Sequence, residues 1–354
     1  MIFFVLSGFL VGGTVVQAVE ARQWSWIDYT VARMTRLWIV LFPAILLTAF
    51  WDSLGMTIIS SSFYDGGMQA TYNSGPAPNP WRYNIATLLG NLTFLQTIAV
   101  PIFGSNGPLW SLANEFWYYV LFPLLFCSVA GSAPVRAKLS SAAIALALCI
   151  VLPNSLLLYG LIWLFGVAAF CLHRRHTFTR THRNMFLWCS GVLLAILLAV
   201  NKRNPGEFFD FAIGAVFAAM LLPLSQMGKI SVGIGKLSRV VAEFSYTLYL
   251  THFPIAAFLA CYVLGNQRLM PGFTSAAIFV GLFVTLILYS FLVYLSFERN
   301  TRPVRRMMMQ LSVKSFSSET NSSLDFGCLN TRTFHCRRMK TGFISAEERY
   351  TDRS

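Results

Sequence analysis

Charged residues are scarce in this sequence. Only 12% of its 354 residues are Asp, Glu, Lys or Arg, whereas 56% are hydrophobic, and the mean hydropathy is +0.59. The apolar residues form blocks of roughly membrane-spanning length, and most Lys and Arg lie between these blocks. This pattern indicates one polytopic membrane domain, rather than the one or two soluble domains that the length alone suggests.

Several motifs with known chemistry are also absent. The seven cysteines form no CxxC pair, so the sequence indicates neither a disulfide framework nor a zinc site, and we expect no metal. There is no GxSxG motif, P-loop or GxGxxG in a strand–turn–helix context. The first residues have no basic region and no small-residue cleavage signal, so they do not predict a removable signal peptide.

The formal net charge of +13 indicates basic loops at a membrane surface rather than nucleic-acid binding. The basic residues cluster in short loops beside the apolar segments, as is typical of cytoplasmic loops. We therefore expect membrane lipids as partners and no nucleic acid.

The apolar pattern predicts an all-α, polytopic helical bundle with nine spans. The spans are expected at 1–19, 37–52, 109–130, 139–153, 156–173, 185–201, 208–225, 241–264 and 274–297. Basic loops on both sides of the region between Arg36 and Arg136 require an even number of crossings there. The apolar stretch 84–101 would add a third crossing and make their number odd, so we expect it to be re-entrant or interfacial.

The same charge rule predicts an external N-terminus and a cytoplasmic C-terminus in an inner or plasma membrane. The membrane domain should cover 1–310. Residues 311–354 are polar, of mixed charge and without apolar periodicity, which predicts a disordered cytoplasmic tail. The polar stretch 53–83 should lie outside the cytoplasm.

Two arginines stand where the chain re-enters the membrane from the predicted cytoplasmic side. Arg33 and Arg36 are spaced i, i+3, which places both guanidinium groups on one face of a helix. Two forked cations suit a phosphate or pyrophosphate group. The alternative is an anchor that reaches the lipid headgroups.

Two ionisable residues lie inside predicted spans. Glu115 follows Trp110 and Ser111, and a carboxylate at this depth needs a partner or water. It is a candidate base, hydrogen-bond acceptor for a sugar hydroxyl, or partner of an arginine. His252 is a candidate for proton transfer, or a neutral histidine bonded within the core, and Tyr246 lies on its helix face.

Five segments, in order along the chain, resemble those of the membrane acyltransferase-3 family. They are FFVLSGFL at 3–10 for FFxxSGFL, Arg33 and Arg36 for RxxR, WSLANE at 110–115 with FP at 122–123 for WSLxxE and FP, SYTLYLTHFP at 245–254 for SYxLYLxHxP, and Glu298–Arg299 for the terminal ER. Each segment alone is a weak signal, and together they cover residues 1–306.

The resemblance implies a membrane O-acyltransferase that moves an acyl group, commonly acetyl from acetyl-CoA, to a hydroxyl of a surface or exported carbohydrate or glycolipid. Arg33 and Arg36 would hold the CoA phosphates. We assign catalysis to Glu115 and His252 and substrate binding to Trp110, Ser111 and Tyr246.

The family's first helix, which bears a histidine regarded as the catalytic base, has no counterpart in this sequence, and His252 matches a different family position. The sequence therefore leaves open a fragment of a longer enzyme or a paralogue without activity. A third alternative is a transporter or flippase for a polar or lipid-linked substrate, since buried ionisable groups between spans serve transport equally well.

Overall fold

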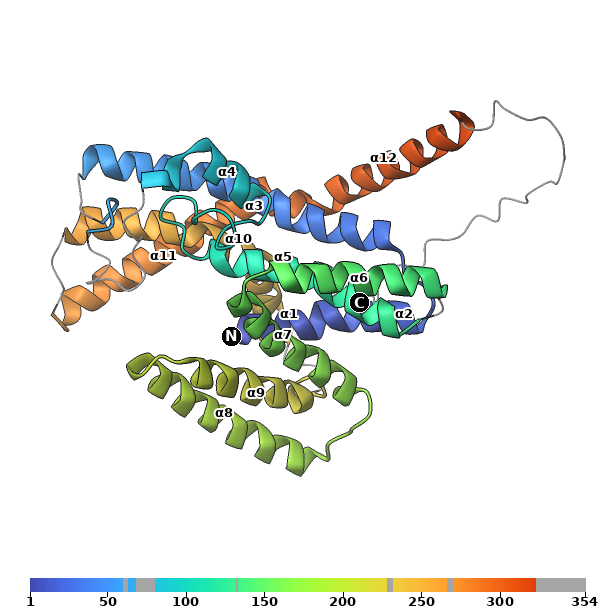
Figure 1. The fold of residues 1–354 in the computed structure, drawn as a ribbon. Helices are drawn as coiled ribbons and strands as arrows, with labels where there is room; N and C mark the ends of the chain where they lie inside the picture. Colours follow the sequence, from blue (N-terminus) through green and yellow to red (C-terminus); the bar gives the residue numbers. More distant parts are fainter. Residues whose placement is uncertain (60–62, 68–79, 132, 228–231, 266–269, 323–354) are drawn as a thin grey trace, which may run out of the picture. The chain divides into compact units, whose positions relative to one another are not determined.

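A computed structural model describes residues 1–59, 63–67, 80–131, 133–227, 232–265 and 270–322, and Figure 1 shows them as a set of helices. The α-helices are α1 Ile2–Ser7, α2 Gly13–Glu20, α3 Trp26–Ile58, α4 Ile85–Leu92, α5 Leu109–Val129, α6 Val135–Val151, α7 Asn154–His173, α8 Arg180–Arg203, α9 Glu207–Leu224, α10 Val232–Leu264, α11 Phe273–Ser296 and α12 Thr301–Ser322. A π-helical segment, η1 Gly8–Gly12, joins α1 to α2, and η2 Pro80–Tyr83 and η3 Glu298–Asn300 are 3-10 turns.

The all-α membrane fold is confirmed. Within the described ranges, 8 helical stretches are long and apolar enough to cross a membrane. The remaining predicted span, 139–153, falls in α6, whose 17 residues make a helix about 26 Å long, close to the ~30 Å hydrocarbon thickness. The stretch 84–101 contains only the 8-residue helix α4 followed by irregular backbone, so it does not span, as expected.

Helix α3 begins earlier than the hydropathy indicated. The span was predicted from residue 37, but the helix starts at Trp26, where the Ser25 hydroxyl accepts a hydrogen bond from the Asp28 N–H at 3.3 Å. Arg33 and Arg36 therefore stand inside a continuous helix, as their i, i+3 spacing indicated, although they precede the predicted span. Arg33 is about 10 Å along the axis from the first residue of α3.

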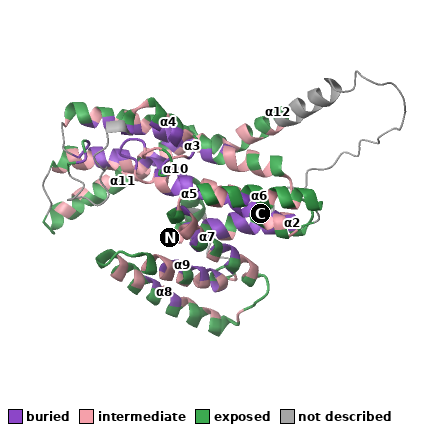
Figure 2. Cartoon of the chain, in the orientation of Figure 1, coloured by how far each residue is buried: buried purple, intermediate pink, exposed green. Residues whose placement is uncertain are grey.

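The N-terminal helical segment, α1 to α2, and α5 are the most buried of the apolar helices, at 56% and 61% of their hydrophobic windows. The corresponding share is 11% for α8, and Figure 2 shows the contrast. Gly8 and Gly166 allow the close approach of η1 to α7, because a Cβ on either would lie within about 2 Å of a carbonyl oxygen of the other helix. The packing of α1 against α7 places Phe4 and Trp163, both almost fully buried, in the core.

The chain divides into two compact units, Met1–Met309 and Gln310–Ser354. Helix α12 continues to Ser322, so the backbone beyond residue 311 is helical where we expected a disordered segment. Arg, Met, Gln and Leu have high helix propensity and fill positions 305–311, in the first half of α12, from which the helix continues. The rest of the predicted tail, 323–354, lies outside the described residues, and the boundary at 310 stays a prediction.

Candidate active site

A buried carboxylate on α5 connects three helices. Glu115 is 4% exposed, and its Oε1 accepts hydrogen bonds from the Ser7 hydroxyl at 2.7 Å and from the Tyr119 hydroxyl. Ser7 in turn accepts a hydrogen bond from Trp163 Nε1 at 3.2 Å, which joins α1, α5 and α7. Glu115 Oε2 is buried and has no hydrogen-bond partner within the part of the chain that the structure describes. One carboxylate oxygen thus accepts two hydrogen bonds, whereas the other accepts none from the described residues.

Arg33 lies beside this carboxylate, between two tyrosine rings. Its guanidinium carbon is 5.8 Å from the ring centroid of Tyr29 and 5.8 Å from that of Tyr119, within the range of cation–π contacts. The Tyr29 hydroxyl donates to the Tyr119 carbonyl at 3.0 Å. The charges of Arg33 and Arg36 both act on Glu115. The site therefore places two cations near one buried carboxylate.

The two arginines differ in exposure. Arg33 is half-buried, and its Nε has no hydrogen-bond partner among the described residues, whereas Arg36 is exposed. Arg36 also interacts electrostatically with Glu298 and with Tyr246, whose hydroxyl donates to the Leu37 carbonyl at 3.3 Å. Arg33 is therefore partly enclosed by two tyrosine rings, whereas Arg36 is open to either a lipid headgroup or a ligand.

A second group of side chains forms around Tyr249 of α10. The Ser111 and Tyr249 hydroxyls are 2.5 Å apart, and the Phe3 ring stacks on Tyr249 with centroids 5.5 Å apart. His252 Nδ1 lies 2.9 Å from both the Leu248 and Tyr249 carbonyl oxygens of its own helix. When Nδ1 donates there, Nε2 becomes the acceptor nitrogen.

The structure thus brings Arg33, Arg36 and Glu115 into one cluster and places Tyr246 beside them. Ser111 belongs to the Tyr249 group, and Trp110 packs against Phe4 and Tyr159, with ring centroids 5.8 and 6.0 Å apart. No hydrogen bond in the described part of the chain joins His252 to Glu115 or to either arginine.

Sequence reasoning missed Ser7, Tyr119 and Trp163 as partners of the carboxylate. Tyr119 carries a local signal, because positions i and i+4 of a helix are neighbours. Ser7 lies within the FFxxSGFL segment, but only the packing of α1 on α5 pairs it with Glu115. Trp163 has no motif at all and reaches Ser7 across 156 residues.

A second buried carboxylate, also missed, holds the segment that precedes α5. Asp52 is 0% exposed and accepts hydrogen bonds from the Ser105 N–H at 2.7 Å, the Ser105 hydroxyl at 2.6 Å and the Tyr83 hydroxyl at 3.2 Å. Burial and the nearby Asp52 carboxylate raise the pKa of Tyr83, so this hydroxyl keeps its proton. Gly104 has φ +59°, and a Cβ there would lie 2.4 Å from Asp52 Oδ2.

The residue that follows Ser105 connects this segment to α10. Asn106 Nδ2 donates to the Thr48 hydroxyl at 3.0 Å and to the Leu250 carbonyl at 2.9 Å. Helix α5 begins three residues later and carries Ser111 and Glu115 on its first two turns. The segment therefore sets the position of α5 relative to both α3 and α10.

Replacing Asp52 by alanine is expected to lower the free energy of unfolding by about 3 kcal/mol, because it leaves buried donors of Ser105 without a charged acceptor. Thermal unfolding of the purified protein in nanodiscs measures the change. Asp65 offers a matched control, since it is exposed and, within the described ranges, accepts the Gly67 N–H at 2.8 Å. Equal losses for Asp52→Ala and Asp65→Ala would contradict the positioning role.

In the described residues, no group of three or more His, Cys, Asp or Glu side chains is arranged to hold a metal ion. A family model described as an acyltransferase domain, Acyl_transf_3, matches residues 1–295. No curated protein and no solved structure matches the chain. The family match covers most of the sequence and all of the site described above, and 8 apolar helices accompany it. The chain therefore belongs to the acyltransferase-3 family of membrane acyltransferases.

Proposed function

We propose that this protein transfers an acyl group, in the first instance acetyl, from acyl-CoA to a hydroxyl of a surface or exported carbohydrate or glycolipid. The observation that carries the proposal is the buried Glu115, whose Oε1 is held by Ser7 and Tyr119 while Oε2 is unpartnered in the described chain. Acyl transfer to an alcohol requires such an acceptor for the hydroxyl proton.

The donor is proposed to dock through Arg33 and Arg36. Planar guanidinium groups form forked hydrogen bonds to phosphate oxygens, and two of them on successive turns match a ligand with several phosphates. Arg33 offers its buried, unpartnered Nε within the described structure, and Arg36 is exposed at the same helix face. In the predicted topology this face opens to the cytoplasm, where acyl-CoA is available, in an inner or plasma membrane.

The acceptor hydroxyl is proposed to donate a hydrogen bond to Glu115 Oε2. Its oxygen attacks the thioester carbonyl carbon, the proton moves to the carboxylate, and the C–S bond breaks as the tetrahedral intermediate collapses. The proton then passes to the departing thiolate, so that the products are the ester and free CoA thiol. His252 is the second candidate proton acceptor, through Nε2.

Trp110, Ser111 and Tyr246 are proposed to position the acceptor. Trp110 offers an aromatic face of the kind that packs on apolar surfaces of ligands, and the paired hydroxyls of Ser111 and Tyr249 can exchange hydrogen bonds with a sugar. These side chains stand on α5 and α10, beside the segment that Asp52 and Asn106 hold.

Replacing Arg33 by alanine is expected to weaken binding of acetyl-CoA by about 10- to 100-fold, because a charge-assisted contact to phosphate is worth roughly 1.5–3 kcal/mol. Equilibrium binding of labelled acetyl-CoA to the full chain in nanodiscs measures the loss. Arg180→Ala is the control, since Arg180 is exposed in the first turn of α8 and lies outside the site. Unchanged affinity of Arg33→Ala for acetyl-CoA would contradict the proposed donor site. Transport of a substrate without acyl transfer would favour a transporter.

A further inference from the structure

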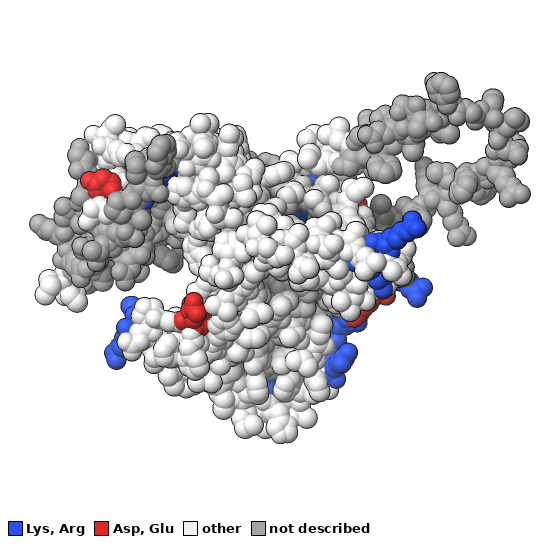
Figure 3. Space-filling view, in the orientation of Figure 1, with Lys and Arg blue, Asp and Glu red and all other residues white. Residues whose placement is uncertain are grey.

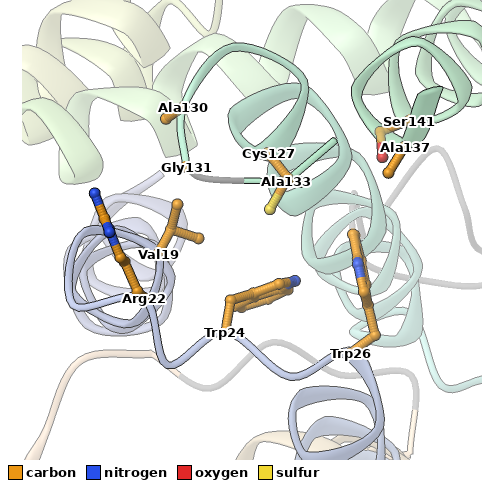
Figure 4. A pocket seen from close by; sticks show the side chains of 10 residues that line it. All are labelled: Val19, Arg22, Trp24, Trp26, Cys127, Ala130, Gly131, Ala133, Ala137 and Ser141. Atoms are coloured by element: carbon orange, nitrogen blue, oxygen red, sulfur yellow. The ribbon is translucent and has the colours of Figure 1, made fainter. Parts of the chain in front are cut away.

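A pocket of about 230 Å³ lies where the end of α2, the start of α3, the end of α5 and the start of α6 meet. Figure 4 shows two indoles, Trp24 and Trp26, along one side and the Cys127 sulfur facing the Trp24 ring. Small side chains form the rest of the wall, and Arg22 stands at the rim. The remaining lining residues are Val19, Ala130, Gly131, Ala133, Ala137 and Ser141.

The wall of this pocket suits a flat, aromatic ligand group. The Trp24 and Trp26 rings are nearly perpendicular, with centroids 5.1 Å apart, so Trp26 presents its face beside the edge of Trp24. Trp24 Nε1 is buried and has no hydrogen-bond acceptor in the described structure. The volume is below the 300–1,000 Å³ typical of pockets for drug-sized ligands, so it fits one ring system.

The pocket joins the proposed donor site through one tyrosine. The Trp24 ring centroid is 5.0 Å from that of Tyr29, and Tyr29 also contacts the Arg33 guanidinium. Arg22 brings a positive charge to the pocket, and Arg136 and Lys138 are the sequence neighbours of the lining residue Ala137 in the first turn of α6. In Figure 3, Lys and Arg side chains gather at the right of the view, over the end of α2.

We infer that this pocket binds the adenine ring of the acyl donor, while Arg33 and Arg36 hold its phosphates; the inference rests on the function proposed above. A purine has a π-face for Trp26 and ring nitrogens that can accept the free Trp24 N–H. In the donor, the ribose separates the base from the phosphates. In the protein, Tyr29 separates the pocket from Arg33 in the same way. Arg22 adds a cation for the phosphate nearest the base.

The test compares two acyl donors that share the reactive arm. Trp26→Leu is expected to weaken binding of acetyl-CoA to the full chain in nanodiscs by about tenfold, the scale of one lost base–aromatic stack. It should leave binding of S-acetyl-4′-phosphopantetheine, which lacks the adenosine, within about twofold of wild type. Adenosine 3′,5′-bisphosphate should compete with acetyl-CoA in the wild type and lose that effect in Trp26→Leu.

Two variants guard against a trivial loss of fold. Trp26→Phe keeps an aromatic ring and should recover most of the affinity, and Trp188→Leu removes an indole that is 77% exposed on α8, outside the pocket, and should change nothing. Acetyl-CoA affinity that is unchanged in both Trp24→Leu and Trp26→Leu would overturn the adenine site. So would a loss seen equally with both donors. If these variants lose only their thermal stabilisation by phosphatidylglycerol, the pocket is a lipid site and the inference is wrong. No binding of either donor by wild type would instead refute the proposed function itself.

Discussion

Valine in place of Gly166 is expected to prevent the chain from reaching its folded state. A Cβ at this position would lie 2.0 Å from the Val5 carbonyl oxygen and 2.6 Å from the Phe9 amide nitrogen. Both are backbone atoms of the α1–η1 segment, so no side-chain rotation relieves the clash and the helices must separate. Overpacking of a core costs typically 1–3 kcal/mol when side chains can yield, and we expect more than about 3 kcal/mol here.

The control for this substitution is Gly191→Val on α8, where a Cβ would have no heavy atom within 4 Å. Both substitutions put the same β-branched residue into the interior of a helix, so the difference between them measures packing alone. The readouts are the yield of monodisperse protein after detergent extraction and its unfolding temperature. Equal behaviour of the two variants would contradict the close approach of α1–η1 to α7.

The same contact explains why the Glu115 cluster depends on packing far from the carboxylate. Ser7 lies between Val5 and Phe9 on the segment that packs against Gly166. Its hydroxyl accepts a hydrogen bond from the Trp163 N–H and donates one to Glu115. Moving α1 away from α7 would therefore remove one of the two donors that fix Oε1. Gly166→Ala already carries the Cβ that makes this clash, so it should also disturb the Glu115 site.

The helices that cross the membrane could be predicted because hydropathy is a local property of the sequence. The start of α3 could not be found this way, because the charged turns from Trp26 to Arg36 lower the hydropathy although they are helical. A different signal was present there. Ser25 and Asp28 form an S-x-x-D pattern before an apolar run, which marks a helix N-terminus.

The candidate site was predictable only where chemistry is unusual for its position. A carboxylate at Glu115 inside an apolar span and an RxxR pair stand out in any sequence. Asp52 is equally buried, but it was assigned to the end of a span, where a charge is unremarkable. Its partner Ser105 is 53 residues away, in an irregular segment whose path no periodicity predicts. The pairing of Ser7 with Glu115, 108 residues apart, is of the same non-local kind.

Glutamine in place of Glu115 is expected to lower acyl transfer at least about 100-fold, the smaller end of the range for loss of a general base. The substitution keeps the size of the side chain and an oxygen that can accept from Ser7 and Tyr119. It removes the negative charge and the capacity to take the hydroxyl proton. Binding of acetyl-CoA should be kept, because its phosphates are assigned to Arg33 and Arg36. The substitution also removes a negative charge that would repel these phosphates.

Transfer of labelled acetyl groups in membranes, together with equilibrium binding of acetyl-CoA, separates these effects. Glu243→Gln is the matched control: Glu243 also accepts a hydrogen bond from a tyrosine hydroxyl, that of Tyr294 at 3.1 Å, but lies exposed on α10. Wild-type transfer by Glu115→Gln would assign the proton elsewhere, with His252 as the next residue to replace. A parallel loss of binding and transfer would instead make Glu115 a structural partner of Arg33, because a base that acts only on the acceptor leaves donor affinity unchanged.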